Sequence, residues 1–216
     1  MSWPTRARGC LRLALFGLLS DCALTSKADA IYPRFFSPEA EPAQTVSPPP
    51  ARTTLALRMG QVEAASYVEE RFAYRLGPSE LAYYEDRRWT EAPERYVRRA
   101  LERELFQQRN IRRTVSGPGS TLDVELTAFE ELQGAPARVR LALNFSLHDE
   151  RQSQLERRVV VERPLPPNAR GASARDVTNA LGLALTAAVL DVSDQVTREL
   201  QAPTPEPCAA AEPQPP

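Results

Sequence analysis

The chain is poor in histidine and lysine, and it carries no surplus of charge of either sign. His148 is the only histidine, which excludes a zinc site built on several histidines and any Ser-His-Asp triad whose base is another residue. The 27 basic and 28 acidic side chains give a formal net charge of −1. Because nucleic acid binding needs a basic excess on one face, we expect no nucleic acid partner. The sequence indicates no metal, no cofactor and no catalytic residue.

A hydrophobic run long enough to span a membrane is missing from the N-terminal segment. The apolar run Leu13–Leu19 is far shorter than the roughly 20 residues that a membrane-spanning helix needs. It follows Arg6, Arg8 and Arg12, and a basic segment before a short apolar one is typical of an export signal. We therefore expect residues 1–21 to be a signal peptide.

The end of this run resembles the lipobox of bacterial lipoproteins. Leu19 lies three places before Cys22, and the resemblance implies that Cys22 is acylated and becomes the mature N-terminus. Asp21 departs from the pattern, since lipoboxes have Gly or Ala directly before the cysteine. The alternative is ordinary cleavage after Ala30, at a small-x-small sequence, which would release a soluble periplasmic protein. Ala23 resembles the signal for sorting to the outer membrane.

Neither of the other two cysteines has a partner for a structural disulfide. Cys10 falls in the signal peptide, and Cys208 lies in a Pro-rich tail. Once Cys22 is acylated, no cysteine pair is left in the mature chain, although export would permit a disulfide. The folded domain must therefore be stabilised by burial alone.

The 20 prolines are too many for one compact domain, and most of them lie in two segments. Residues 37–52 and 201–216 are rich in Pro and Ala and have too little apolar surface to pack. The expected organisation is a lipid-anchored Pro-rich linker over 22–53 with a short aromatic edge strand at Tyr32–Phe36, a folded domain over 54–200, and a disordered tail over 201–216.

Within the domain, the spacing of apolar residues changes from strand to helix and back. Ser173 and Asp176 resemble a capping box with Asp in place of Glu, so a long buried helix is expected to follow them. The period predicts strands at 55–62, 71–76, 80–84, 121–128, 138–147 and 156–163, and helices at 93–108 and 177–196. The predicted fold class is α+β, with a mostly antiparallel sheet and two amphipathic helices packed on one face.

Two of these strands predict their own register. A four-residue loop over 133–136 joins them, and alternation puts all the apolar residues of both strands on one face if paired residue numbers sum to 269. The expected pairs are Val124–Phe145, Leu126–Leu143, Ala128–Leu141 and, on the other face, Glu131–Arg138.

Motifs for catalysis or phosphate binding are missing. Gly117–Ser120 is Gly-rich but lacks the Lys and the strand–loop–helix context of a phosphate loop, so it predicts a turn. No Gly-x-Ser-x-Gly sequence occurs. His148 ends a predicted strand beside two acidic residues, and we expect it to be a charge-paired surface histidine.

The segment Leu81–Trp89 concentrates aromatic and basic side chains. It holds Tyr83, Tyr84, Arg88 and Trp89 between an expected strand and the first helix. The favoured interpretation is structural: Trp89 fills the junction of sheet and helix, with Arg88 stacked or paired nearby. The alternative is functional, because Tyr, Trp and Arg dominate the hot spots of protein interfaces. These four residues are the candidate partner-binding residues.

The order of these features resembles the ABC-type transport auxiliary lipoproteins, the PqiC/YmbA-like family. The resemblance rests on the lipobox-like Cys22, the aromatic PRFF segment, the Pro-rich spacer and, most specifically, the strand–hairpin–YYEDRRW–helix block of residues 71–105. It implies a TolB-N-like domain, lipid-anchored on the periplasmic face of the outer membrane. It also implies an MCE-domain protein and an ABC transporter permease and ATPase as partners in lipid transport.

We therefore expect a non-enzymatic adaptor that docks on a transporter and can form a homo-oligomer through its sheet edges. Two alternatives stay open. One is an envelope assembly factor that chaperones another outer-membrane component. The other is a periplasmic hydrolase, which would need a nucleophile in a cleft and His148 as its base.

Overall fold

The computed structural model describes residues 31–38, 54–117, 119–150, 152–167 and 172–202. The expected signal peptide, Cys22, most of the linker and the tail lie outside these residues. The sheet and the helices belong to the unit that starts at Pro33. In chain order the elements are β1 (Arg34–Phe36), β2 (Ala56–Ala64), β3 (Arg71–Gly77), β4 (Glu80–Trp89), α1 (Pro93–Glu102), the π-helix η1 (Arg103–Gln108), β5 (Arg112–Arg113), β6 (Ser120–Leu132), β7 (Arg138–His148), β8 (Ser153–Pro164) and α2 (Ala174–Gln201).

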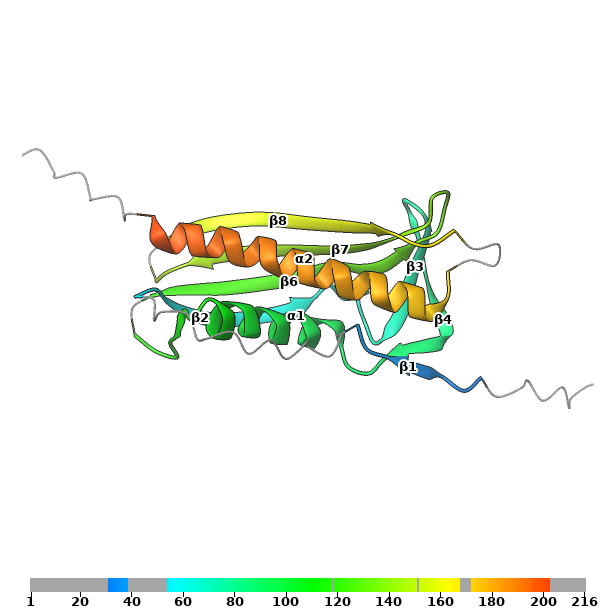
Figure 1. Cartoon of the computed structure of the whole chain (residues 1–216), viewed down its shortest axis with the longest axis horizontal. Helices are drawn as coiled ribbons and strands as arrows, with labels where there is room; N and C mark the ends of the chain where they lie inside the picture. The colour runs from blue at the N-terminus through cyan, green and yellow to red at the C-terminus, as the bar shows by residue number, and fades with distance from the viewer. Residues whose placement is uncertain (1–30, 39–53, 118, 151, 168–171, 203–216) are drawn as a thin grey trace, which may run out of the picture. The chain divides into compact units, whose positions relative to one another are not determined.

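The strands form one mixed sheet of eight strands, and both α-helices lie on the same face of it (Figure 1). On one side of β6 the antiparallel strands β7 and β8 follow in order. On its other side β6 pairs parallel with β2 along its first half and parallel with β3 along its second half. β4 then pairs antiparallel with β3, and the outermost strands β1 and β5 pair parallel with β4 and β2. The predicted α+β class with two helices on one face is confirmed.

The predicted register of β6 and β7 holds for the first half of β6 only. Val124 pairs with Phe145 and Leu126 with Leu143, as predicted, but a β-bulge lies between Leu126 and Ala128. Beyond the bulge Phe129 pairs with Leu141 and Ala128 with Ala142. The predicted pairs Ala128–Leu141 and Glu131–Arg138 are therefore wrong, because the extra residue exchanges the two faces of the rest of the strand.

The long helix α2 begins and packs as predicted. Ser173 is its N-cap: the Ser173 Oγ accepts the Asp176 amide, and the Asp176 carboxylate accepts the Ser173 amide. On length and composition α2 passes for a membrane-spanning helix, but 56% of its apolar window is buried inside the domain. It is a core helix that packs against one face of the sheet. The residues of the predicted apolar stripe are all buried: Val177, Leu181, Ala184, Leu185, Ala188, Val192 and Val196.

The first helix and the strand before it differ from the expectation in their lengths. The α-helical part ends at Glu102, and the chain continues as the π-helix η1, which still buries Leu105. Strand β4 does not end at Tyr84 but runs on to Trp89, with a register shift that adds residues to β4 opposite β3. The aromatic segment is therefore part of the sheet, not a connection between strand and helix.

The short edge strand expected around Tyr32–Phe36 is present as β1, next to β4. The chain leaves β1 across α2, where the carbonyl of Pro38 approaches Gly182 so closely that a Cβ at this position would clash with it. Thr90 donates its amide to the carbonyl of Phe36 at 3.0 Å. The folded part of the chain thus begins ahead of the Pro-rich segment, at β1.

Candidate interaction surface

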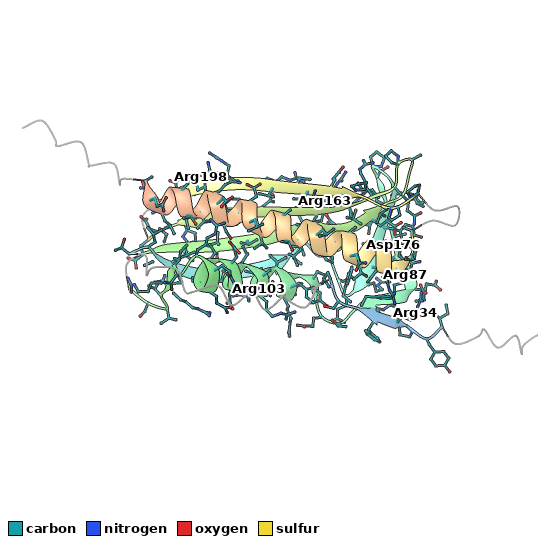
Figure 2. The ribbon with its side chains drawn as sticks, viewed as in Figure 1. Arg34, Arg87, Arg103, Arg163, Asp176 and Arg198 are labelled. Carbon is teal, nitrogen blue, oxygen red and sulfur yellow. The ribbon has the colours of Figure 1, made fainter. Side chains whose placement is uncertain are left out.

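Strand β4 divides the four predicted partner-binding residues between the two faces of the sheet. Tyr84 and Trp89 lie on the face that the helices cover, whereas Tyr83 and Arg88 lie on the helix-free face. Figure 2 shows the neighbouring Arg87 on β4, beside its partner strand β1. All four residues therefore lie in one strand, but they do not form one surface.

Trp89 is a core residue. Only 1% of its surface is exposed, and its ring stacks on Phe72 with centroids 3.7 Å apart. Phe129 meets it edge-on at 4.9 Å. The indole Nε1 is buried without a hydrogen bond partner. Trp89 thus stabilises the core beneath the candidate surface, and its own side chain is not accessible to a partner.

Tyr84 connects to a buried carboxyl group on β6. Its hydroxyl donates to Glu131 Oε2 at 2.9 Å and accepts from Gln133 Nε2 at 2.7 Å. The guanidinium of Arg87 stacks over the Tyr84 ring at 3.8 Å. Burial, with the nearby Glu131 charge, raises the pKa of Tyr84 to about 12, so the hydroxyl stays protonated in any physiological medium.

Burial also raises the pKa of Glu131, although the bond from Tyr84 and the charge of Arg87 oppose that shift. A raised pKa in the folded state means that Glu131 favours folding most at low pH and that this contribution is lost as pH rises through the folded pKa. We expect Glu131→Gln, which keeps the shape and the acceptor for Tyr84, to raise the melting temperature at pH 7 and to have little effect below pH 4.

Melting curves of Glu131→Gln and the unchanged chain from pH 3 to pH 8 measure this difference. The control is Glu125→Gln, which makes the same change of side chain at an exposed residue of the same strand. A melting temperature of Glu131→Gln below that of the unchanged chain at pH 7 would show that the Arg87 charge outweighs the burial of Glu131.

On the helix-free face, Tyr83 and Arg88 are held by backbone groups. The Tyr83 hydroxyl donates to the carbonyl of Tyr67 at 2.7 Å, and Arg88 Nη1 donates to the carbonyl of Tyr84 at 2.9 Å. Arg71 stacks over the Tyr83 ring at 4.1 Å. These contacts fix both side chains in place without burying them fully, which suits residues that contact a partner.

A row of ion pairs continues across the same face, and no sequence pattern predicted it. Arg75 Nε and Nη2 donate to the two carboxylate oxygens of Glu130 at 3.1 and 3.0 Å, and Glu130 is only 1% exposed. Arg140 Nη1 lies 3.7 Å from Glu130 Oε1, and Arg140 Nε donates to Glu162 at 2.9 Å. Arg138 donates to Glu162 at 2.7 Å. The row joins β3, β6, β7 and β8.

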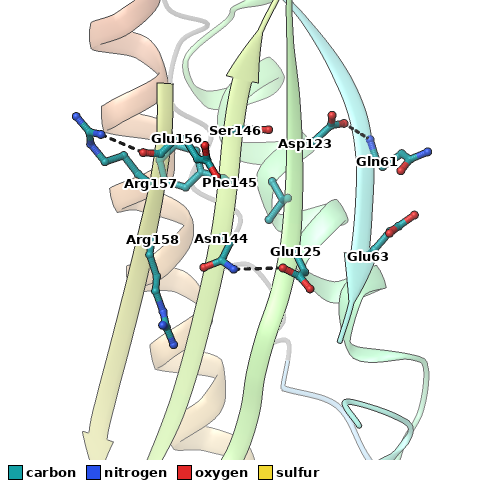
Figure 3. Close-up of a pocket in the computed structure, with 11 residues that line it drawn as sticks. Gln61, Glu63, Asp123, Glu125, Asn144, Phe145, Ser146, Glu156, Arg157 and Arg158 are labelled. Atoms are coloured by element: carbon teal, nitrogen blue, oxygen red, sulfur yellow. Dashed lines mark hydrogen bonds between the residues drawn. The ribbon is translucent and has the colours of Figure 1, made fainter. Parts of the chain in front are cut away.

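Beyond this row the helix-free face is hollowed into a groove of about 550 Å³, which Figure 3 shows. Its walls are polar: Asn144 donates to Glu125 at 3.2 Å, and Asp123 accepts the amide of Gln61 at 2.6 Å. His148 Nε2 lies 2.9 Å from Asp123 Oδ2, and this hydrogen bond raises the pKa of His148. His148 is a charge-paired surface histidine, as expected, although its partner is Asp123 across the strand pair.

The groove has no catalytic arrangement among the described residues. The nitrogens of His148 bond Asp123 and the carbonyl of Asp149, and neither bonds a serine, threonine or cysteine in that part of the chain. Within the same residues, no group of three His, Cys, Asp or Glu side chains is placed to hold a metal ion.

Comparison with known proteins decides the family. The family model of the ABC-type transport auxiliary lipoprotein component matches residues 39–196. The chain belongs to this family. As an auxiliary lipoprotein it has an accessory role in an ABC-type transport system and an association with the cell envelope. No curated protein matches the chain.

Solved structures support the fold of this auxiliary lipoprotein. A Xanthomonas campestris protein of the DUF330 family is 19% identical, with a TM-score of 0.65, over 78% of this chain and 97% of that one. A crystal structure of an uncharacterized protein is 12% identical, with a TM-score of 0.60, over 76% of this chain and 99% of that one. At such identities the likeness shows the fold alone.

Proposed function

We propose that the chain is an acylated, outer-membrane accessory subunit of an ABC/MCE-type lipid transport system, facing the periplasm. The family match over residues 39–196 carries the proposal, since it covers nearly all of the folded domain. The partners are an MCE-domain protein and an ABC transporter permease and ATPase. The chain contributes binding and not chemistry.

Cys22 is the proposed anchor. It follows the short apolar run at the spacing of a lipobox, and the family is one of lipoproteins. Ala23 in the next position favours sorting to the outer membrane. Residues 23–33 join Cys22 to β1 and span about 40 Å at full extension, which keeps the domain close to the leaflet.

The proposed docking surface is the helix-free face around Tyr83 and Arg88. Both side chains are fixed by hydrogen bonds to backbone carbonyls, so little conformational freedom is lost when a partner binds. The row of ion pairs beside them presents both positive and negative charge, which favours a partner whose surface carries the complementary charges.

Affinity capture from cross-linked bacterial membranes tests the proposal. The tagged full chain should co-purify with an MCE-domain protein and ABC transporter subunits, and a Tyr83→Ala/Arg88→Ala double variant should recover clearly less of them. Leu76→Ser is the matched control, because Leu76 is an exposed residue of the neighbouring strand β3. Capture of a different outer-membrane component instead would support the assembly-factor alternative.

The mass of the same purified chain reports how its N-terminus is processed. We expect a mature chain that begins at an acylated Cys22 and a Cys22→Ala variant that is lost from the membrane fraction. A mature chain that begins at Ile31 would show that the protein is cleaved after Ala30 and released as a soluble periplasmic protein. This result would overturn the lipid anchor, whatever the capture experiment shows.

A further inference from the structure

Aromatic residues are exposed in only one stretch of the described chain. Tyr32 and Phe35 are 83% and 63% exposed, whereas every other Tyr, Phe and Trp in the described residues is half-buried or buried. Ile31 is exposed as well. Large apolar side chains gathered in one exposed stretch mark a contact surface more often than scattered single ones do.

Phe35 is held out of the core by the sheet itself. Phe36, the next residue of β1, points to the helix side and packs on Phe72 with ring centroids 5.4 Å apart. Because neighbouring residues of a strand point to opposite faces, Phe35 is directed to the helix-free side, opposite Arg88 of β4. β1 is the outermost strand at this end of the sheet, so nothing described covers Phe35.

The position of β1 in the chain indicates what lies against it. With the anchor of the proposed function at Cys22, β1 is the first element of the described residues after the membrane and is tied to it by residues 23–33. Tyr is enriched at the bilayer interface, since its ring can enter the apolar side while its hydroxyl stays hydrated, and a Phe ring adds apolar area that the interface can bury.

We propose that β1 contacts the lipid leaflet, with Phe35 in the headgroup region. The inference rests on the lipid anchor of the proposed function. Arg34 and Arg71 near Phe35 are in ion pairs, Arg34 with Asp86 at 3.0 Å and Arg71 with Glu69 at 2.6 Å. Arg88, opposite Phe35, donates to the backbone carbonyls of Tyr84 and Arg87. The proposed contact is that of the apolar Phe35 ring, which does not require anionic lipid.

The test uses the unacylated chain from Ala23 onward, which contains every described residue, and vesicles of neutral phosphatidylcholine. A Phe35→Trp variant should shift its emission to the blue on vesicles and be quenched by brominated acyl chains, whereas Leu76→Trp should not. Trp89 is present in both variants and is buried, so its emission is a constant background.

Partitioning of the Phe35→Ser chain onto the same vesicles should be about tenfold weaker than that of the unchanged chain, as expected for one aromatic ring lost from an apolar contact. Leu76→Ser should bind like the unchanged chain. Failure of the chain to bind, or binding with an unquenched Phe35→Trp, would overturn the membrane contact. Neither result depends on acylation of Cys22 or on partner capture, so the proposed function would be left standing.

Discussion

Replacing Trp89 by alanine is expected to lower the free energy of unfolding by about 3–5 kcal/mol, the range for removing a buried aromatic side chain. The ring stacks on Phe72 and meets Phe129 edge-on, so its loss opens a cavity where β3, β4 and β6 join. Phenylalanine at position 89 should cost far less. It keeps most of the stacking and removes the indole Nε1, a buried donor that has no acceptor.

Urea denaturation followed by circular dichroism measures both variants, since the midpoint shifts with stability while the slope reports the surface exposed on unfolding. Leu76→Ala, at a residue that is 51% exposed, is the control and should change stability by less than about 0.5 kcal/mol. Trp89→Phe keeps most of the stacking on Phe72. If it is nevertheless as unstable as Trp89→Ala, the indole contributes to stability through a contact other than this stacking. If Trp89→Phe is stable but captures no partner, Trp89 has a direct role in binding.

The apolar alternation in the sequence predicted the register of β6 and β7 up to Leu126, because each pair there joins two core residues. Strict alternation ends at the adjacent Ala128 and Phe129, and the bulge lies at this point. β6 also changes its parallel partner here, from β2 to β3. Pairing between strands far apart in the chain is not encoded in a local pattern, so the bulge could not be derived from it.

The same bulge decides the surroundings of two neighbouring acids that the sequence cannot tell apart. It turns Glu130 to the helix-free face, beneath Arg75, and Glu131 to the helix side, beside Tyr84. One acid is therefore held in an ion pair, whereas burial raises the pKa of the other. Alternation continued through the bulge would give Glu131 the Arg-paired position on the helix-free face that Glu130 in fact holds.

For the candidate site, the sequence predicted which residues matter better than it predicted the face of the sheet on which each of them lies. The structural interpretation of Trp89 agrees with its burial, because a large ring just before a helix fills the junction of sheet and helix. Tyr83 and Tyr84 are neighbours in a strand and so face opposite ways. The local pattern placed them at the end of a shorter strand, since the extra residues of β4 opposite β3 leave no trace in the spacing of apolar residues.

The second large effect is expected at the ion pair of β3 and β6. Arg75→Ala should lower the free energy of unfolding by about 3–5 kcal/mol, the range for leaving one partner of a buried pair uncompensated. Glu130 would then remain buried with only Arg140 Nη1 nearby, at 3.7 Å. Arg75 also donates to the carbonyl of Pro78 at 3.2 Å, so the turn between β3 and β4 would lose a contact as well.

A double variant separates these two causes. If the uncompensated charge dominates, Glu130→Ala introduced into the Arg75→Ala chain should restore part of the lost stability, because a buried carboxylate disappears with it. Arg138→Ala is the matched control: its partner Glu162 is partly exposed and keeps Arg140, so the loss should stay below about 1 kcal/mol. Urea midpoints that simply add in the double variant would instead show that the two side chains act independently. The row of ion pairs would then lie on the helix-free face without stabilising its geometry. The proposed docking surface around Tyr83 and Arg88 would in that case have no rigid support from this row.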